Sequence, residues 1–390
     1  MNITRLLKGN SKDENMILLA VCSAFLPYYI ATAAIAVIAL YILISKKRIS
    51  GCTKGISNAL LYSFSLISLL TAFVYDNLFG MAVSLAFFGL ILIINFSANV
   101  CTPKFFEKVL FAVTVMSVVL SIATFIEKIF YLNQSVNHRC AAWCLNPNYL
   151  ADILVFSIIT CAYLEITKKC DVFYCYVVAG TNILALYCTG SMSSWVALFT
   201  GISVLLFIMK HHISLGILFM AATFGILMLI VVPELFPRLN QTGHTTLYRI
   251  EIWEGVIEEI KKLPLFGRGF FACKHLNMFH GGSMVTWHSH NIILEVLLCF
   301  GIVGTAVGGS GFYILLRRIT HRHEKTSTHG DFSDYLIALL AANLVHSMVD
   351  LTLFWSQTAL IAAIVLGGVL GCTVKRENEL DGKNNTVLGG

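Results

Sequence analysis

The sequence has few charged residues for its length. Only 12% of its 390 residues are Asp, Glu, Lys or Arg, whereas 57% are hydrophobic, and the mean hydropathy is +0.79. A soluble domain carries about 25% charged residues, so this chain lacks the polar residues that a water-exposed surface needs. The composition therefore excludes two or three ordinary soluble domains and predicts one all-α, polytopic membrane bundle.

The sequence also lacks the patterns of other protein classes. It contains no glycine-rich nucleotide-binding motif, no internal repeat and no CxxC pair among its twelve cysteines. Most cysteines lie in apolar runs, where they act as small apolar residues. Cys140 and Cys144 are exceptions, because they stand four positions apart in a predicted outward loop. There they either form a disulfide or remain thiols.

Apolar runs long enough to cross a bilayer, about 18 residues or more, occur along most of the chain. The clear ones lie near residues 58–75, 78–96, 109–130, 148–165, 172–189, 193–209, 213–232, 291–316, 332–352 and 354–372. A first apolar stretch, 16–44, contains Pro27 and has basic residues on both sides, which places both of its ends at the cytoplasmic face. It therefore predicts two short spans, at 16–26 and 28–44.

The predicted topology has twelve spans with both termini in the cytoplasm. Basic residues occur in short clusters between the apolar runs, so the net charge of +6 reports membrane topology and does not indicate nucleic-acid binding. Every cluster falls on a cytoplasmic segment in this count. Residues 1–375 then form one transmembrane domain and 376–390 a disordered cytoplasmic tail. The outward segments include 131–147 and a long loop, 233–290.

The outward loop 233–290 is 58 residues long and holds five of the twelve histidines. Long ordered loops are usually functional. Within it, residues 246–262 show helical periodicity up to Pro264 and Gly267, with charged residues on one face. The opposite face is apolar and comprises Ile250, Trp253, Val256, Ile257 and Ile260. We predict an amphipathic helix on the outer membrane surface.

Arg249 lies in the middle of this apolar face. One interpretation is that its side chain snorkels to lipid headgroups. The alternative is that it points into the bundle and holds an anion, since a guanidinium offers five donors in a fixed fork that suits phosphate or pyrophosphate. The residues alone leave both interpretations open.

His288 and His290 close the loop at the start of the span 291–316. A histidine at this position is either a cap or interfacial residue or, as a neutral imidazole facing the outer compartment, a base that accepts a proton from a hydroxyl. A metal site is disfavoured, because Glu295 inside the span is the only nearby carboxylate in the sequence. The prediction is therefore no metal and no cofactor.

Two further outward segments carry polar residues. Arg139 precedes the sequence NPN at 146–148, in which Asn148 is predicted to cap the following helix. His346 and Asp350 stand at i and i+4, on one face near the outer end of the eleventh span. Ionisable residues in membrane spans are functional candidates. The alternative is a buried polar contact that fixes helix packing.

These segments, in this order, resemble the O-antigen ligase and polymerase family of bacterial envelope glycan enzymes. The resemblance is close over about 130–310 and extends to the whole chain through the twelve-span layout with one large outward loop. It rests on Arg139 with NPNYLA at 146–151, on Arg249 and Trp253 with PLFGRGF at 264–270, and on His290 and Asn291 followed by Gly301 and Gly304.

The resemblance implies a C-type glycosyltransferase architecture in the bacterial cytoplasmic (inner) membrane and metal-independent, inverting transfer at its outer face. The donor would be a glycan on an undecaprenyl pyrophosphate carrier, and the acceptor a hydroxyl of a glycan, lipid or protein. His290 would act as general base, and Arg249 and Arg139 would bind the pyrophosphate. Four residues would support them: Asn291, Trp253, Asn148 and Asp350.

One position departs from the family pattern. Members carry an arginine after a serine in the turn before the eighth span, where this chain has Met192. Either Arg139, Arg238, Arg268 or Lys274 replaces it, or this protein binds its donor less tightly. A transporter or flippase of lipid-linked polysaccharide is the competing function class, although such proteins tend to show internal repeats. The motifs do not separate a ligase from a polymerase.

Overall fold

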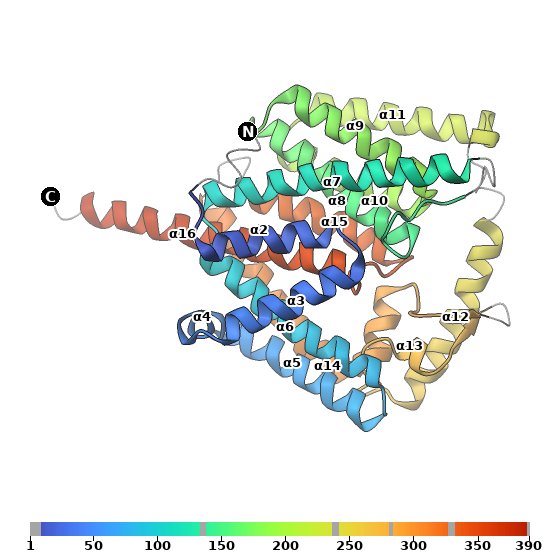
Figure 1. Cartoon of the computed structure of the whole chain (residues 1–390), viewed down its shortest axis with the longest axis horizontal. Coiled ribbons are helices and arrows are strands. Elements are labelled where there is room, and N and C mark those ends of the chain that lie inside the picture. Colours follow the sequence, from blue (N-terminus) through green and yellow to red (C-terminus); the bar gives the residue numbers. More distant parts are fainter. Residues whose placement is uncertain (1–8, 133–137, 236–241, 281–283, 327–331, 388–390) are drawn as a thin grey trace.

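A computed structural model of the chain describes residues 9–132, 138–235, 242–280, 284–326 and 332–387 (Figure 1). Its elements are α2 (Lys12–Ala24), α3 (Tyr28–Leu43), α4 (Lys46–Cys52), α5 (Ile56–Val74), α6 (Leu78–Val100), α7 (Pro103–Tyr131), α8 (Pro147–Ile166), α9 (Val172–Thr189), α10 (Met192–Ile208), α11 (His212–Val231), η1 (Pro233–Leu235), α12 (Thr242–Lys262), α13 (Ala272–His275), β1 (Phe279–His280), β2 (Met284–Val285), α14 (Ile292–Thr326), α15 (Phe332–Ser347) and α16 (Ser356–Val387). β1 and β2 form a short antiparallel hairpin. All other regular elements in these residues are helical, which confirms the predicted all-α class.

The helices lie where the apolar runs predict them. Among the described residues, eight helices are long and apolar enough to cross a membrane: α5, α6, α7, α8, α9, α11, α14 and α16. The bent pair α3 and α4, which meet at 107°, adds a ninth candidate. The remaining predicted spans coincide with α2, α10 and α15, whose 13, 17 and 16 residues fall short of the length usually needed to cross.

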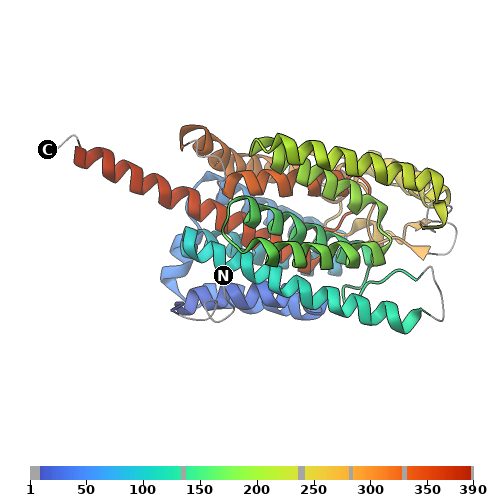
Figure 2. The same cartoon turned by 90° about the horizontal axis from the view of Figure 1, so that it is seen from above.

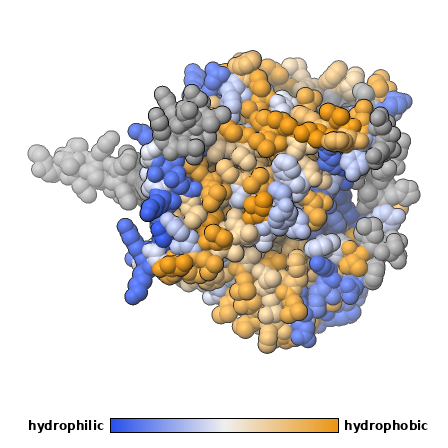
Figure 3. Space-filling model, in the orientation of Figure 1, coloured by the Kyte–Doolittle hydropathy of each residue, from blue (hydrophilic) through white to orange (hydrophobic). Residues whose placement is uncertain are grey.

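The outer surface of the bundle is apolar. α11 is apolar along its whole length, yet none of its residues is buried inside the protein. A helix of this kind would expose a large apolar surface to water, so its surroundings must be lipid. Figure 3 shows apolar side chains over the middle of one face and hydrophilic ones gathered toward its two ends, as expected for a membrane-embedded bundle.

The two ends of the bundle carry different elements. Figures 1 and 2 show the helices running lengthwise, with α4 and the C-terminus at one end and α12 at the other. Basic residues of separate segments gather at the α4 end, where Arg48 pairs with Asp13 at 2.9 Å and Lys169 with Glu107 at 3.4 Å. The α12 end, called the loop end below, holds the long predicted loop.

Pro27 divides the first apolar stretch as predicted. α2 ends at Ala24, and α3 begins at Tyr28, directly after the proline. Proline cannot supply the N–H that a continuing helix needs, but it fits the position before a new helix begins. The stretch therefore forms two short helices that pack against each other in the bundle.

The predicted disordered tail is wrong over much of its length. α16 continues from the membrane-crossing part to Val387, and Figure 1 shows it extending away from the bundle. The sequence KRENEL after the apolar part of α16 consists mainly of good helix formers, so the backbone continues as helix. Residues 388–390 lie outside the described residues.

Candidate functional site

Asp350 is the centre of a polar cluster at the loop end of the bundle. It follows α15 and is 1% exposed. Its Oδ1 lies 3.2 Å from His290 Nδ1 and 3.5 Å from His288 Nε2, and it accepts the Leu351 N–H at 2.9 Å. Its Oδ2 accepts an N–H of the Asn148 amide. Three hydrogen-bond donors and the His288 ring therefore surround one carboxylate, which can accept about four hydrogen bonds when ionised.

These hydrogen bonds fix the protonation of both imidazoles. The His290 backbone N–H donates to His288 Nδ1 at 3.2 Å, so a neutral His288 ring carries its proton on Nε2, toward Asp350. His290 Nδ1 faces the same carboxylate and carries a proton in order to donate to it. A neutral His290 therefore has its lone pair on Nε2, where the ring can accept a proton from a substrate.

Burial separates the roles of the two histidines. His288 is 3% exposed, and its burial, followed by repulsion from His290 and Arg249, lowers its pKa to about 3 despite the attraction of Asp350. His288 is therefore neutral near pH 7 and a weak base. The His290 side chain remains 26% exposed. Burial alone would raise the pKa of Asp350, but the hydrogen bond and charge of His290 outweigh it and lower that pKa below its usual range.

Arg249 lies on α12 near His288 and is half-buried. Two residues of the predicted apolar face of this helix, Ile250 and Ile257, are each 41% exposed. The residues of α12 that are buried inside the protein are Ile252 and Val256, which pack with side chains of α14 and of the segment before α13. Arg249 is close enough for its charge to influence the His288 ring.

Ser289 stands between the two histidines and anchors them. Its N–H donates to Glu295 Oε2 at 2.6 Å, and its carbonyl accepts the Trp253 indole N–H at 2.9 Å. The backbone at His290 has a φ of 56°, a conformation that non-glycine residues rarely adopt and that surrounding contacts must hold. From the sequence, Glu295 was weighed only as a metal ligand. Its position as a carboxylate inside an apolar span was the feature that could have indicated a role in holding Ser289.

Arg139 and Asn148 connect a second segment to Asp350. Arg139 donates to Asn148 Oδ1 at 2.6 Å and to the Thr189 carbonyl at 2.9 Å. The predicted cap of α8 is wrong, because Asn146 caps the helix and accepts the Asn148 N–H at 2.8 Å. The Asn148 amide is thereby left for Arg139 on one side and Asp350 on the other.

Asn291 joins the start of α14 to the loop that carries Asp350. Its Oδ1 accepts the N–H groups of Ile293 and Leu294, which caps the helix, and its Nδ2 donates to the Met348 carbonyl at 3.2 Å. This contact fixes His290 and Asp350, sixty positions apart in the chain, at their short distance.

His346 and Asp350 do not share the predicted helix face. α15 ends at Ser347, so Asp350 lies beyond the helix and turns toward His290. The fully buried His346 ring instead contacts the Ser194 hydroxyl at 3.1 Å and the Thr352 hydroxyl at 3.4 Å. The i, i+4 argument failed because it assumed a helix that continued through Asp350.

α14 is broken at Gly301, where φ is 59° and ψ is −169°. The segment 264–269 pairs with the backbone groups at this break: Leu265 O accepts the Val303 N–H at 2.9 Å, and Cys299 O accepts an N–H of the segment at 2.7 Å. Unpaired backbone groups inside a membrane are costly. A Cβ at Gly301 would lie 2.4 Å from the Leu265 carbonyl carbon, so both conformation and contact require glycine there. The hydrogen bonds at this break explain why the PLFGRGF motif at 264–270 occurs together with the motif that contains Gly301.

An apolar cavity of about 690 Å³ lies inside the bundle. Trp287, Ile292 and Trp355 line it beside the cluster, since Trp287 precedes His288 in the chain. Side chains of α3, α6, α14, α15 and α16 line the remainder, as far as Leu316 near the opposite end. This end of the bundle therefore combines an imidazole bound to a buried carboxylate, a nearby guanidinium and a long apolar cavity.

Residues 177–307 match the family model described as O-Antigen ligase. The match covers 131 of the 390 residues, so this part of the chain is similar to the O-antigen ligase family. It agrees with the resemblance drawn from the motifs and supports an activity of the ligase or polymerase type. No curated protein matches the chain. The matched region includes Arg249 and His290, whereas Arg139, Asn148 and Asp350 lie outside it.

The arginine that the resemblance leads one to expect at Met192 has several candidate replacements in this chain. Arg268 is bound to Glu259 at 2.6 Å, so its charge is neutralised within the protein. Lys274 lies with its ammonium 3.6 Å from the Trp287 ring centre and 4.2 Å from that of Phe79. Both aromatic rings line the apolar cavity. Arg238 lies outside the described residues.

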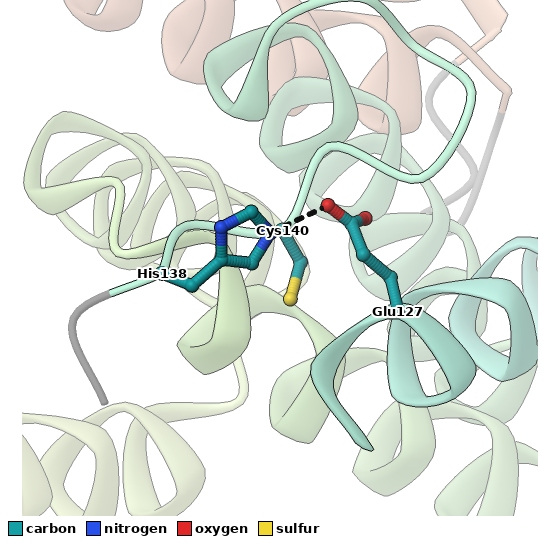
Figure 4. Close-up of side chains that lie close together, drawn as sticks. All are labelled: Glu127, His138 and Cys140. Carbon is teal, nitrogen blue, oxygen red and sulfur yellow. Dashed lines mark hydrogen bonds and ion pairs between the residues drawn. The ribbon is translucent and has the colours of Figure 1, made fainter. Parts of the chain in front are cut away.

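Two groups of side chains in the described residues have the composition and spacing of metal ligands. One is His288, His290 and Asp350, so Asp350 supplies the carboxylate that the sequence argument against a metal had not found. The other is Glu127, His138 and Cys140 (Figure 4). All twelve cysteines lie in described parts of the chain and are free thiols, so Cys140 and Cys144 are not joined.

Proposed function

We propose that this protein transfers a glycan from an undecaprenyl pyrophosphate carrier to an acceptor hydroxyl, with inversion at the anomeric carbon. The observation that carries the proposal is His290, whose Nδ1 is held by the buried Asp350 carboxylate while its Nε2 is left to accept a proton. The family match supports the class of reaction, and this geometry supports His290 as its base.

The proposed reaction balances around four bonds. His290 Nε2 takes the acceptor hydroxyl proton as the acceptor oxygen bonds to the anomeric carbon. The bond from that carbon to the phosphate oxygen breaks on the opposite side, and the carrier pyrophosphate leaves with the electron pair. Asp350 stabilises the imidazolium that forms. A positioned base of this kind contributes about 10²- to 10⁴-fold to the rate.

The carrier lipid fits the apolar cavity beside this base. Its lining is aromatic and aliphatic, and it runs from Trp287 toward Leu316. A polyprenyl chain placed there would hold its pyrophosphate near the polar cluster, where Arg249 and Arg139 provide positive charge. We propose that Lys274 takes the place of the arginine missing at Met192. Three cations would then neutralise the charge that develops on the leaving pyrophosphate.

We propose a twelve-span topology with the loop end outside the cytoplasm. The basic clusters gather at the α4 end, and Lys and Arg mark cytoplasmic ends. α2, α10 and α15 are short for spans, but each packs against longer helices that cross. Short spans are tolerated where neighbouring helices cover them or the bilayer thins.

The proposal is tested with purified protein, a lipid-pyrophosphate-linked glycan donor and separate glycan, lipid and protein acceptors. Product that forms with one acceptor class distinguishes ligase from polymerase. We propose that no metal takes part at the reacting atoms, since the hydrogen bonds of His288 and His290, including the one between His288 Nε2 and the Tyr149 hydroxyl, engage three of their four ring nitrogens. The second group of metal-ligand side chains, Glu127, His138 and Cys140, loses its thiol in a Cys140→Ser protein. In that protein a chelator should leave glycan transfer unchanged. Chelator-sensitive transfer there would contradict metal independence.

Arg249→Lys is expected to reduce transfer at least about tenfold, which corresponds to roughly 1.4 kcal/mol of transition-state stabilisation. Lysine offers a point charge in place of the two parallel hydrogen bonds that a guanidinium gives to pyrophosphate. Arg249→Ala should lose more. The measurement is transfer rate against donor concentration at matched expression. Arg318→Lys, at the opposite end of the bundle, is the control. Near-normal activity of Arg249→Lys would mean that Arg249 only anchors the protein to the membrane surface.

Lys274→Met is expected to raise the donor KM about tenfold, the equivalent of one charge-assisted hydrogen bond, with a smaller change in kcat. Lys274→Arg should restore most of the affinity because it restores the charge. Lys261→Met on the exposed face of α12 removes the same charge away from the cavity and serves as the control. A donor KM that does not change in Lys274→Met would exclude Lys274 as the replacement.

A further inference from the structure

Glu127, His138 and Cys140 form a compact group away from Asp350 (Figure 4). Glu127 stands near the end of α7, and the other two residues lie in the segment that leads to α8. Their ligand atoms all lie within 4.8 Å of one another, and Glu127 Oε1 is 2.8 Å from His138 Nε2. The group joins a carboxylate, an imidazole and a thiol, the three side-chain types that bind zinc.

Contacts around the group hold each ligand in a fixed orientation. Glu127 Oε2 accepts the N–H groups of Ala141 and Ala142 at 3.0 and 2.5 Å, which leaves Oε1 directed at His138. The His138 ring stacks on Tyr131, with centres 4.0 Å apart and planes at 16°. Such outer contacts are typical of metal sites, where they set the direction of the ligands.

We infer that Glu127, His138 and Cys140 bind a zinc ion. Ligand atoms around tetrahedral zinc lie about 3.3 to 3.7 Å apart, given metal–ligand distances of about 2.0 to 2.3 Å. The three atoms here are close to this arrangement and need small side-chain rotations to reach it. The fourth position is filled by water or by the thiol of Cys188, whose carbonyl accepts the Cys140 N–H at 3.0 Å.

Zinc binding involves a defined proton release. Burial, followed by the charges of Glu127 and Cys188, raises the pKa of the Cys140 thiol to about 12, so without metal the thiol keeps its proton. Zinc binds the thiolate, so the Cys140 proton leaves to solvent as the zinc–sulfur bond forms. Glu127 and His138 retain 20% and 26% side-chain exposure, which gives the ion a path to the site.

The inferred site bears directly on Arg139, which lies between His138 and Cys140 in the chain. The flanking side chains turn toward Glu127, whereas Arg139 turns toward Asn148, so alternate residues of this segment point in opposite directions. An ion that fixes the flanking residues would fix Arg139 against Asn148. This consequence rests on the proposed function, while the zinc site itself does not.

The test measures zinc in purified full-length protein after incubation with zinc and removal of loosely bound ion. Wild type is expected to retain about one zinc per chain, and Cys140→Ser and Glu127→Gln at least about tenfold less. Cys144→Ser, a buried thiol four positions away, should retain the wild-type amount. Cobalt in place of zinc should give a thiolate-to-cobalt absorption band in wild type and Cys144→Ser only.

Folding of the variants is checked by thermal unfolding in detergent. Zinc should raise the unfolding temperature of wild type and Cys144→Ser but not that of Cys140→Ser, since only a protein that binds the ion is stabilised by it. Wild type that retains no zinc would overturn the inference. So would a Cys140→Ser protein that retains the wild-type amount, or zinc that is lost in Asp350→Asn but kept in Cys140→Ser.

Discussion

Replacing His290 with alanine is expected to reduce glycan transfer at least about 10²-fold, because the base that accepts the acceptor proton is removed. The protein should still insert and accumulate normally, since His290 is partly exposed and its removal opens no cavity in the core. Transfer is measured with saturating donor and acceptor, and abundance by immunoblot of the membrane fraction. Donor binding should remain, because the charges that would hold the pyrophosphate are unchanged.

Two further histidine variants make the result specific. His288→Ala should be milder, since a ring with a pKa of about 3 is too weak a base to replace His290 and acts through its contacts. His212→Ala, at an exposed position at the start of α11, should have no effect. A His290→Ala protein that kept half or more of the wild-type transfer would show that His290 is not the base.

Much of the architecture was readable from the sequence because lipid imposes strong rules on composition and length. Apolar runs located the helices, and Pro27 divided the first stretch into α2 and α3 as predicted. The weaker predictions concerned helix ends. α15 stops at Ser347, so Asp350 lies outside the helix and contacts His290 instead of sharing a helix face with His346.

The candidate site was only partly readable, because its geometry comes from distant segments. The motifs named His290, Arg249 and Arg139, but no local pattern shows that Asp350 approaches His290 across sixty positions. Hydrogen bonds to backbone groups are equally invisible in the sequence, which is why the anchoring of Ser289 by Glu295 was not predicted. The type of a side chain shows which chemistry it can perform, whereas its contacts in the folded protein decide which role it has.

Asp350→Asn tests whether this long-range contact matters. An amide has one acceptor oxygen and an NH₂ group, and it carries no negative charge. Asp350 Oδ1 meets the His290 ring and the Leu351 N–H, whereas Oδ2 meets only the Asn148 amide. The amide oxygen should therefore take the Oδ1 position, with its NH₂ group facing Asn148. The variant should assemble normally and keep the His290 tautomer, but it loses the charge that stabilises the imidazolium.

We expect Asp350→Asn to lower kcat at least about 10²-fold, a loss similar to that of the base itself, with donor KM within about threefold of wild type. Asp350 acts through His290 and makes no proposed contact with pyrophosphate, so its loss should affect the chemical step more than binding. Asp76→Asn is the matched control: Asp76 is exposed in a turn after α5, and asparagine tolerates its φ of 54°. Unchanged kcat, or a KM that rises as much as kcat falls, would show that Asp350 does not act through the base.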